Sequence, residues 1–372
     1  MGYRHYADRF QNARQQYNIM ALVGNGFDIQ VLSKYKRSPT TRYEDFYDAM
    51  IANHVNPNNL IVHQMESLKT AGKHNWSDVE ARLKDLSRAG ETVTDIIASL
   101  TEVRREFSKF LNDVVSSSLL ADLSEDAENN AWSRGSLSKF LRDLDTYQKL
   151  KRVAFGARMN NYDAYNFFFV NFNYTSLLDN YLFLDSTQFD PHPNTTVDTN
   201  FMFNTNPRGL GPATNWNFDS SSYLTLEVVH PHGYQDIPRS LLFGTEYDGN
   251  PTGRSKKLAK AYWAQNDLKY SDLFDETALF IVFGCSLGNT DSWWWENIIQ
   301  SLLADSSRAA IIYWWNPLGR AGRDENGVLD LFMTAGDISL ASDEADQLRD
   351  QVSVVVYTDQ TERVWLSMLQ PN

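Results

Sequence analysis

The chain has 372 residues, of which 42% are hydrophobic and 22% charged, and this composition excludes disordered, collagen-like and low-complexity classes. Its 34 basic and 47 acidic residues give a net charge of −13, which argues against general binding to nucleic acid or anionic lipid. The single cysteine, Cys285, excludes a disulfide framework and favours a reducing cytoplasm. The sequence contains no signal-peptide pattern and no long uncharged apolar stretch, so we expect neither export nor a membrane span.

Short continuous apolar runs predict strands that are buried on both faces, as in a parallel sheet. The first run covers residues 19–23, and similar runs follow at residues 167–172, 279–283, 310–315 and 352–357. Weaker strand candidates are residues 224–229 and 241–243, and helical patterns occupy residues 176–183 and 292–303. Strands that alternate with helices predict one α/β domain, over residues 1–372, with a parallel sheet.

Two insertions are expected in this domain. Residues 43–155 show helical spacing, with Val79, Leu83 and Leu86 on one face, and Ser77 with Glu80 forms a capping box that would start this helix. Residues 185–222 are polar, rich in turn-forming residues and without a sustained period. We interpret the first as a helical insertion and the second as a polar loop insertion.

The turn after the first strand contains Gly24, Asn25, Gly26, Phe27 and Asp28. Two glycines allow a tight turn and a close approach of backbone N–H groups to a phosphate, at an edge where parallel sheets bind ligands. A simple strand-to-helix turn explains the same pattern, because Ile29 stands where the dinucleotide fingerprint has a third glycine. Asp28 is either a helix cap or an acidic site residue.

Polar residues also follow the next two strands. After residues 167–172, Asn173 faces either the crevice, as a site residue, or the following helix, as a cap, and Thr175 is the other cap candidate. His230 and His232 follow the third strand, beside Gly233. A histidine there suits a general base, whereas a metal site would need a third ligand that is not spaced nearby, so we expect no metal.

Two later turns are candidate nucleotide surfaces. Gly284, Cys285 and Ser286 follow the strand at residues 279–283 and offer small groups to a phosphate or ribose. Cys285 is either a nucleophile or a small buried thiol. Asn316 follows the strand at residues 310–315, where its amide either bonds a ribose hydroxyl or starts a turn. The tryptophans at 293–295 pack on the sheet or form a stacking platform.

Taken in order, seven motifs resemble the AbiH-type bacteriophage abortive-infection family over residues 19 to about 320. The motifs are GNGFD at 24–28, TRYEDF at 41–46, NWSDVE at 75–80, NFNYT at 171–175, HPHG at 230–233, LLFG at 241–244 and FGCSLGNTD at 283–291.

That family is similar in turn to the sirtuin-like, Rossmann-type NAD-binding fold. The resemblance implies a sirtuin-like domain in which an NAD site is formed by Gly24, Gly26, Asn173, His232, Gly284, Ser286 and Asn316, with Asn25, Phe27 and Asp28 beside them. Thr175 stands where sirtuins carry Asp, and the four cysteines of the sirtuin zinc ribbon are missing, which disfavours a protein deacetylase.

The resemblance therefore implies an NAD-consuming immune effector that releases nicotinamide through an oxocarbenium-like transition state. Asn173 would position the ribose or the attacking water, His232 would accept the proton, and Asp28 would stabilise the cationic sugar. The partners expected are NAD or a related nucleotide, a phage-derived trigger or partner protein, and a second copy of the chain. A nucleotide sensor without turnover is the alternative, and a nucleic-acid-acting effector ranks last because of the net charge.

Overall fold

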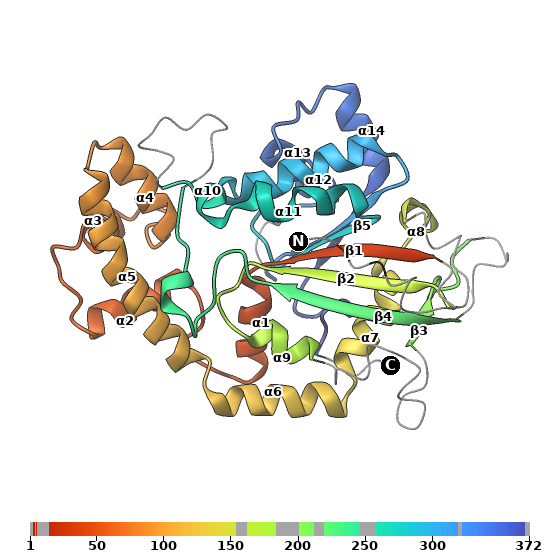
Figure 1. Cartoon of the computed structure of the whole chain (residues 1–372), viewed down its shortest axis with the longest axis horizontal. Coiled ribbons are helices and arrows are strands. Elements are labelled where there is room, and N and C mark those ends of the chain that lie inside the picture. Colours follow the sequence, from red (N-terminus) through yellow and green to blue (C-terminus); the bar gives the residue numbers. More distant parts are fainter. Residues whose placement is uncertain are drawn as a thin grey trace.

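The computed structural model describes Tyr3, His5 and residues 15–153, 162–183, 201–211, 219–245, 258–318 and 322–368. Its centre is a seven-stranded sheet with the order β3-β4-β2-β1-β5-β6-β7 (Figure 1). The strands are β1 (Gln16–Val23), β2 (Ala164–Asn171), β3 (Phe201–Asn204), β4 (Asp219–Val229), β5 (Leu279–Phe283), β6 (Ala309–Trp315) and β7 (Val352–Tyr357). All neighbouring strands are parallel except β3 and β4. The predicted α/β class with a mostly parallel sheet is confirmed.

The central strands are buried on both faces, which explains their unbroken apolar runs. In β1, Ile19, Ala21 and Val23 contact one hydrophobic core, while Met20 and Leu22 contact the other. The register places Val23 beside both Asn171 of β2 and Phe283 of β5. The residues that follow these three strands therefore emerge side by side at the carboxyl edge.

Helices cover both faces of the sheet. The first core contains residues of α1 (Gly26–Lys34), α6 (Ser117–Asn129), α7 (Trp132–Lys139) and α9 (Leu177–Leu182), and the second contains residues of α11 (Asn266–Glu276), α12 (Ser292–Ala304), α13 (Glu325–Ala335) and α14 (Asp343–Gln351). Two short helices are α8 (Tyr147–Arg152) and α10 (Lys260–Ala264). None of the described helices combines the length and apolar character needed to cross a membrane.

The expected helical segment is present and stands at one end of the sheet. It contributes α2 (Tyr43–Ala52), α3 (Leu60–Thr70), α4 (Val79–Arg88) and α5 (Val93–Val114), which lie beyond the arrowhead ends of the strands in Figure 1. Val79, Leu83 and Leu86 are buried on one face of α4, as their spacing predicted. The last residues of the predicted segment, 154 and 155, lie outside the described residues.

Three local predictions are corrected. Residues 241–243 form no strand; Leu241 and Phe243 are apolar because they pack into the first core from a loop. The capping box at Ser77 is wrong, because Asp78 is the N-cap of α4 and its carboxylate accepts a hydrogen bond from the Ala81 N–H at 3.0 Å. In the polar insertion at 185–222, residues 185–200 and 212–218 lie outside the described residues, and β3 and the start of β4 occupy described parts.

Candidate functional site

The strands that follow β1 in the chain, β2 to β4, lie on one side of β1, and the later strands β5 to β7 lie on its other side. The sheet therefore has a topological switch point between β1 and β5. In open α/β sheets, ligand crevices form at such a switch point, outside the carboxyl ends of the strands. A pocket of about 250 Å³ lies here, lined by residues that follow β1, β2, β4 and β5. The carboxyl edge predicted to hold the site is therefore where the structure has a pocket.

The glycines of the first and fifth strand turns pack directly against each other. The Gly26 N–H donates to the Gly284 carbonyl at 3.0 Å, and Gly284 has a φ of +67°. A Cβ on Gly24 would lie 2.6 Å from the Gly284 carbonyl oxygen, and a Cβ on Gly26 would lie 2.7 Å from the Gly284 Cα. Close backbone approach therefore explains all three glycines without a ligand.

The pocket wall includes only part of the predicted glycine turn. Gly24, Asn25 and Asp28 line the pocket, but Gly26 and Phe27 do not. Phe27 is fully buried in the first core, where its ring meets Tyr181 edge-on. The prediction that Gly26 and Phe27 face a bound nucleotide is thus not supported by their placement.

Asn173 lies in the pocket wall, and its neighbour Asn171 points elsewhere. The Asn173 side-chain amide donates to the Gly24 carbonyl at 3.2 Å, which ties the end of β2 to the turn after β1. Its backbone N–H is held by the Asn171 side chain at 3.0 Å. Helix α9 begins after Ser176 without a side-chain cap from Asn173. Of the two interpretations of Asn173, the structure supports a residue of the crevice.

Asp28 is buried in the first turn of α1 and does not cap this helix, because Asn25 is the N-cap. One carboxylate oxygen accepts a hydrogen bond from the Thr175 hydroxyl at 2.7 Å, and the other has no hydrogen-bond partner among the described residues. Burial raises the pKa of Asp28 to about 7, although the Thr175 hydrogen bond opposes the shift. Near neutral pH this carboxyl group exists in both protonation states.

His232 is also buried, and both of its ring nitrogens face acceptors. Nδ1 lies 3.3 Å from the Phe172 carbonyl oxygen, and Nε2 lies 3.2 Å from Oδ1 of Asp291. The ring stacks on Phe172 with centroids 4.8 Å apart. Burial and the nearby Lys260 ammonium lower the pKa of His232, while Asp291 opposes this shift. His232 is therefore held in place from three sides at the pocket wall.

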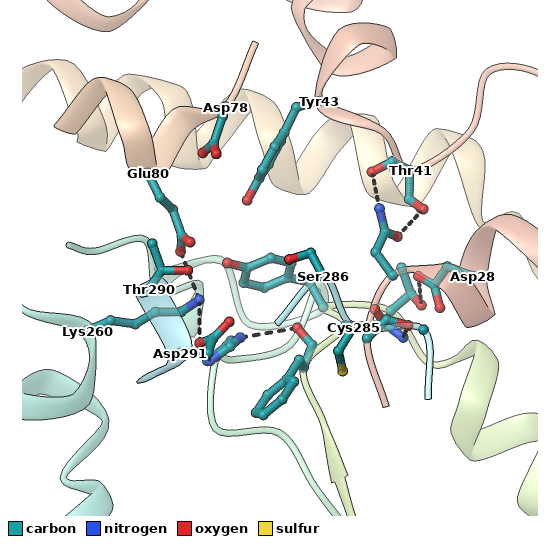
Figure 2. Close-up of a pocket in the computed structure, with 18 of the residues that line it drawn as sticks. Asp28, Thr41, Tyr43, Asp78, Glu80, Lys260, Cys285, Ser286, Thr290 and Asp291 are labelled. Atoms are coloured by element: carbon teal, nitrogen blue, oxygen red, sulfur yellow. Dashed lines mark hydrogen bonds and ion pairs between the residues drawn. The ribbon is translucent and has the colours of Figure 1, made fainter. Parts of the chain in front are cut away.

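Sequence reasoning missed an ion-pair chain that joins the helical segment to His232 (Figure 2). Lys260 Nζ lies 2.9 Å from Glu80 and 3.2 Å from the Asp291 oxygen that contacts His232. Asp291 and Glu80 raise the pKa of Lys260 above its usual value in spite of burial. Burial raises the pKa of Glu80 to about 6, whereas Lys260 and His232 hold that of Asp291 well below its usual range.

The backbone around Lys260 is fixed by the loop that carries the LLFG motif. The Lys260 N–H donates to the Thr245 carbonyl at 3.0 Å, and the Thr245 N–H donates to the Leu258 carbonyl at 2.7 Å. Gly244 is needed here, since a Cβ would lie 2.8 Å from the Lys260 Cα. Nothing in the sequence around Lys260 indicated this role.

The remaining predicted residues divide between the pocket and its surroundings. Gly284, Cys285 and Ser286 line the pocket, and Asn25 exchanges hydrogen bonds with Thr41 at 2.6 and 3.2 Å. Asn316 is not in the pocket wall: its amide group bonds the Arg323 backbone at 2.8 and 3.2 Å and closes a loop. Asn316 follows β6, which lies outside the four strands whose ends form the pocket.

The two interpretations of the tryptophans at 293–295 are also decided. The three consecutive tryptophans are buried in the second core, so packing explains them, although Trp295 also reaches the pocket wall. Within the described ranges, no three His, Cys, Asp or Glu side chains lie close enough to hold a metal ion. The expectation that the site works without metal stays a prediction.

Fold and site together define an α/β protein with a buried, charged pocket at the switch point of its sheet. A family model described as bacteriophage abortive infection AbiH matches residues 20–313. Because this match spans well over half of the 372 residues, the chain belongs to the AbiH family, and a role in abortive infection is indicated. A comparison with curated proteins found no match. The expected family is confirmed, and the sirtuin-like assignment stays a prediction.

Proposed function

We propose that this chain is an anti-phage effector with a sirtuin-like site that binds NAD and hydrolyses it to nicotinamide and ADP-ribose. The observation that supports it is the convergence of Asp28, Asn173 and His232, from the ends of three neighbouring strands, on one pocket. All three side chains are buried and polar, an arrangement that costs folding free energy and is typical of functional sites.

In this proposal, each residue has one role. The Asn173 amide positions the ribose or the attacking water, ionised Asp28 stabilises positive charge that develops on the sugar, and His232 accepts the proton of the water. Asp291 orients the imidazole of His232, since its carboxylate contacts Nε2. Nicotinamide leaves as a neutral molecule, so its departure needs no acid.

A second function, nucleotide sensing without turnover, is favoured by the contacts of His232. Both ring nitrogens already face acceptors, so a water molecule would have to displace the Phe172 carbonyl or Asp291 to reach them. In either version the protein acts in the cytoplasm on NAD or a related nucleotide. A phage-derived signal or partner protein would start its activity, with self-association as one route.

Nicotinamide release separates the two functions. Purified wild-type protein, supplied with extract of phage-infected cells, is incubated with NAD and compared with Asn173→Ala and with Asn180→Ala. Asn180 is the matched control, because its amide bonds the Ser176 carbonyl and it does not line the pocket. Release by the wild type and by Asn180→Ala, with a loss of about 100-fold or more in Asn173→Ala, supports hydrolysis. Binding of NAD without release supports the sensor.

A further inference from the structure

The wall of the pocket is acidic. It carries four carboxyl groups, from Asp28, Asp78, Glu80 and Asp291, and among the described residues that form it Lys260 is the single lysine or arginine. Lys260 is already engaged by Glu80 and Asp291. A phosphate group placed here would meet repulsion from carboxylates, whereas a cation would be attracted.

Aromatic rings complete the acidic wall. Tyr43, Phe107, Phe172, Tyr174 and Trp295 all line the pocket. The electron-rich face of an aromatic ring attracts a cation that lies over it, and protein sites for cationic ligands combine such rings with carboxylates. In Figure 2, Tyr43 and Asp78 extend downward from the helical segment, and the Asp78 carboxylate lies between Glu80 and Tyr43.

The size of the pocket also limits what it can enclose. A volume of about 250 Å³ is below the roughly 300–1,000 Å³ of pockets that enclose drug-sized ligands, so this pocket encloses only part of a dinucleotide. One nucleoside is a better match. The glycine turns, which could have held a pyrophosphate, are occupied by each other's backbone.

We infer that this pocket selects a ribosyl heteroaromatic ring with a positive charge, such as the pyridinium riboside end of NAD, and leaves the phosphates outside. Asp78, at the start of α4, is assigned as the residue that determines this specificity, because the Glu80 and Asp291 carboxylates of the wall are already paired with Lys260. The inference deepens the proposed function and rests on it for the choice of ligand. The pocket should therefore bind the neutral, reduced form of the same riboside less tightly than the cationic form.

The test measures binding of three probes to the full chain by calorimetry: nicotinamide riboside, its dihydro form and adenosine. Wild-type protein should bind the cationic riboside roughly threefold to thirtyfold more tightly than the dihydro form, the range expected for a cation over aromatic rings. Asp78→Asn should reduce this ratio severalfold. Asparagine is as good an N-cap as aspartate, so α4 should be kept, and thermal unfolding checks this.

Glu44→Gln is the matched control, because Glu44 is an exposed carboxylate outside the pocket wall and its loss changes the net charge equally. It should leave the ratio unchanged. Equal affinity for both ribosides, tighter binding of adenosine, or an unchanged ratio in Asp78→Asn would overturn the inference. Nicotinamide release from NAD is measured on the same samples. Release without charge preference leaves hydrolysis standing, and charge preference without release supports the inference together with the sensor.

Discussion

Removing the buried ammonium group of Lys260 is a direct test of the ion-pair chain. Lys260→Met keeps most of the side-chain volume and leaves Glu80 and Asp291 facing each other without the cation between them. The side chains of Lys260 and Glu80 are 6% and 8% exposed, and that of Asp291 is 21% exposed, so water screens these charges poorly. Loss of one partner from a buried pair typically costs about 3–5 kcal/mol, and we expect a decrease of that size in the free energy of unfolding at pH 8.

The decrease should be smaller at pH 5. Burial already raises the pKa of Glu80 to about 6, and removal of Lys260 raises it further. A carboxyl group whose pKa is raised in the folded state stabilises the protein below its unfolded pKa, and this contribution is lost as pH rises through the folded pKa. At pH 5 Glu80 in the variant is protonated and no longer repels Asp291, so part of the cost disappears.

Urea unfolding at pH 5 and pH 8 measures both effects. Lys109→Met is the matched control, since the Lys109 side chain is 58% exposed and its partner Glu106, which is 6% exposed, keeps a second ion pair with Arg105. Such a pair is worth up to about 1 kcal/mol. Glu80→Gln in the Lys260→Met background should restore part of the stability at pH 8. An equal loss at both pH values, or a loss no larger than that of the control, would refute the role of the ion-pair chain.

Three further predictions concern the pocket wall. Gly26→Ala should lower the free energy of unfolding by about 1–3 kcal/mol, because its Cβ would lie 2.7 Å from the Gly284 Cα. Gly288→Ala should not, because among the described residues its Cβ would meet only the Ser286 hydroxyl, at 3.3 Å, and thermal unfolding compares the two variants. Burial raises the pKa of Asp28 to about 7, so ionisation of this carboxyl group should lower the free energy of unfolding of the wild type by about 2–3 kcal/mol between pH 5 and pH 8. Urea unfolding should show that this pH dependence is lost in Asp28→Asn. Asn173→Ala should cost about 0.5–1.5 kcal/mol in the same assay, because the Gly24 carbonyl loses one hydrogen bond and keeps that from the Phe27 N–H, and an unchanged stability would contradict the bond to Asn173.

The strands of the sheet could be predicted because their burial is visible in short stretches of sequence. A strand buried on both faces is apolar at nearly every position. The runs in β1, β5 and β6 are wholly apolar, and those in β2 and β7 each contain one polar residue, Asn171 and Ser353. The loop at 241–243 shows the limit of that argument. Leu241 and Phe243 are just as buried, and the sequence cannot tell whether the partner of an apolar residue is a neighbouring strand or a core reached from a loop.

The sequence predicted the glycine turns correctly, but it could not show which group comes close to the glycines. Close approach of a phosphate and close approach of another backbone both require the absence of a Cβ, so the same residues satisfy either requirement. Gly26 and Gly284 satisfy the second, through a 3.0 Å hydrogen bond between segments some 258 positions apart. Sequence spacing carries no information about a partner at that separation.

Glu80 shows why the ion-pair chain could not be predicted from the sequence. Its position three residues after Ser77 fits a capping box, but Asp78 caps the helix and Glu80 turns to Lys260, which lies 180 residues further along the chain. A short-range hydrogen bond at the surface is worth about 1 kcal/mol, whereas a buried carboxylate without a partner costs several. The need to pair the buried carboxylate therefore determines where the Glu80 side chain points. That partner is set by tertiary contacts, which short-range sequence patterns do not contain.

The pocket therefore exists only when the helical segment is docked on the carboxyl edge of the sheet. Asp28, Asn173 and His232 lie in the segments that follow β1, β2 and β4, while Tyr43, Asp78 and Glu80 come from the helical segment that precedes β2 in the chain. Lys260 joins the two halves through Glu80 on one side and Asp291 on the other. Because Asp291 also contacts His232, a displacement of α4 that breaks the Glu80 contact alters the charge next to that histidine. The helical segment is a wall of the site as well as an insertion into the domain.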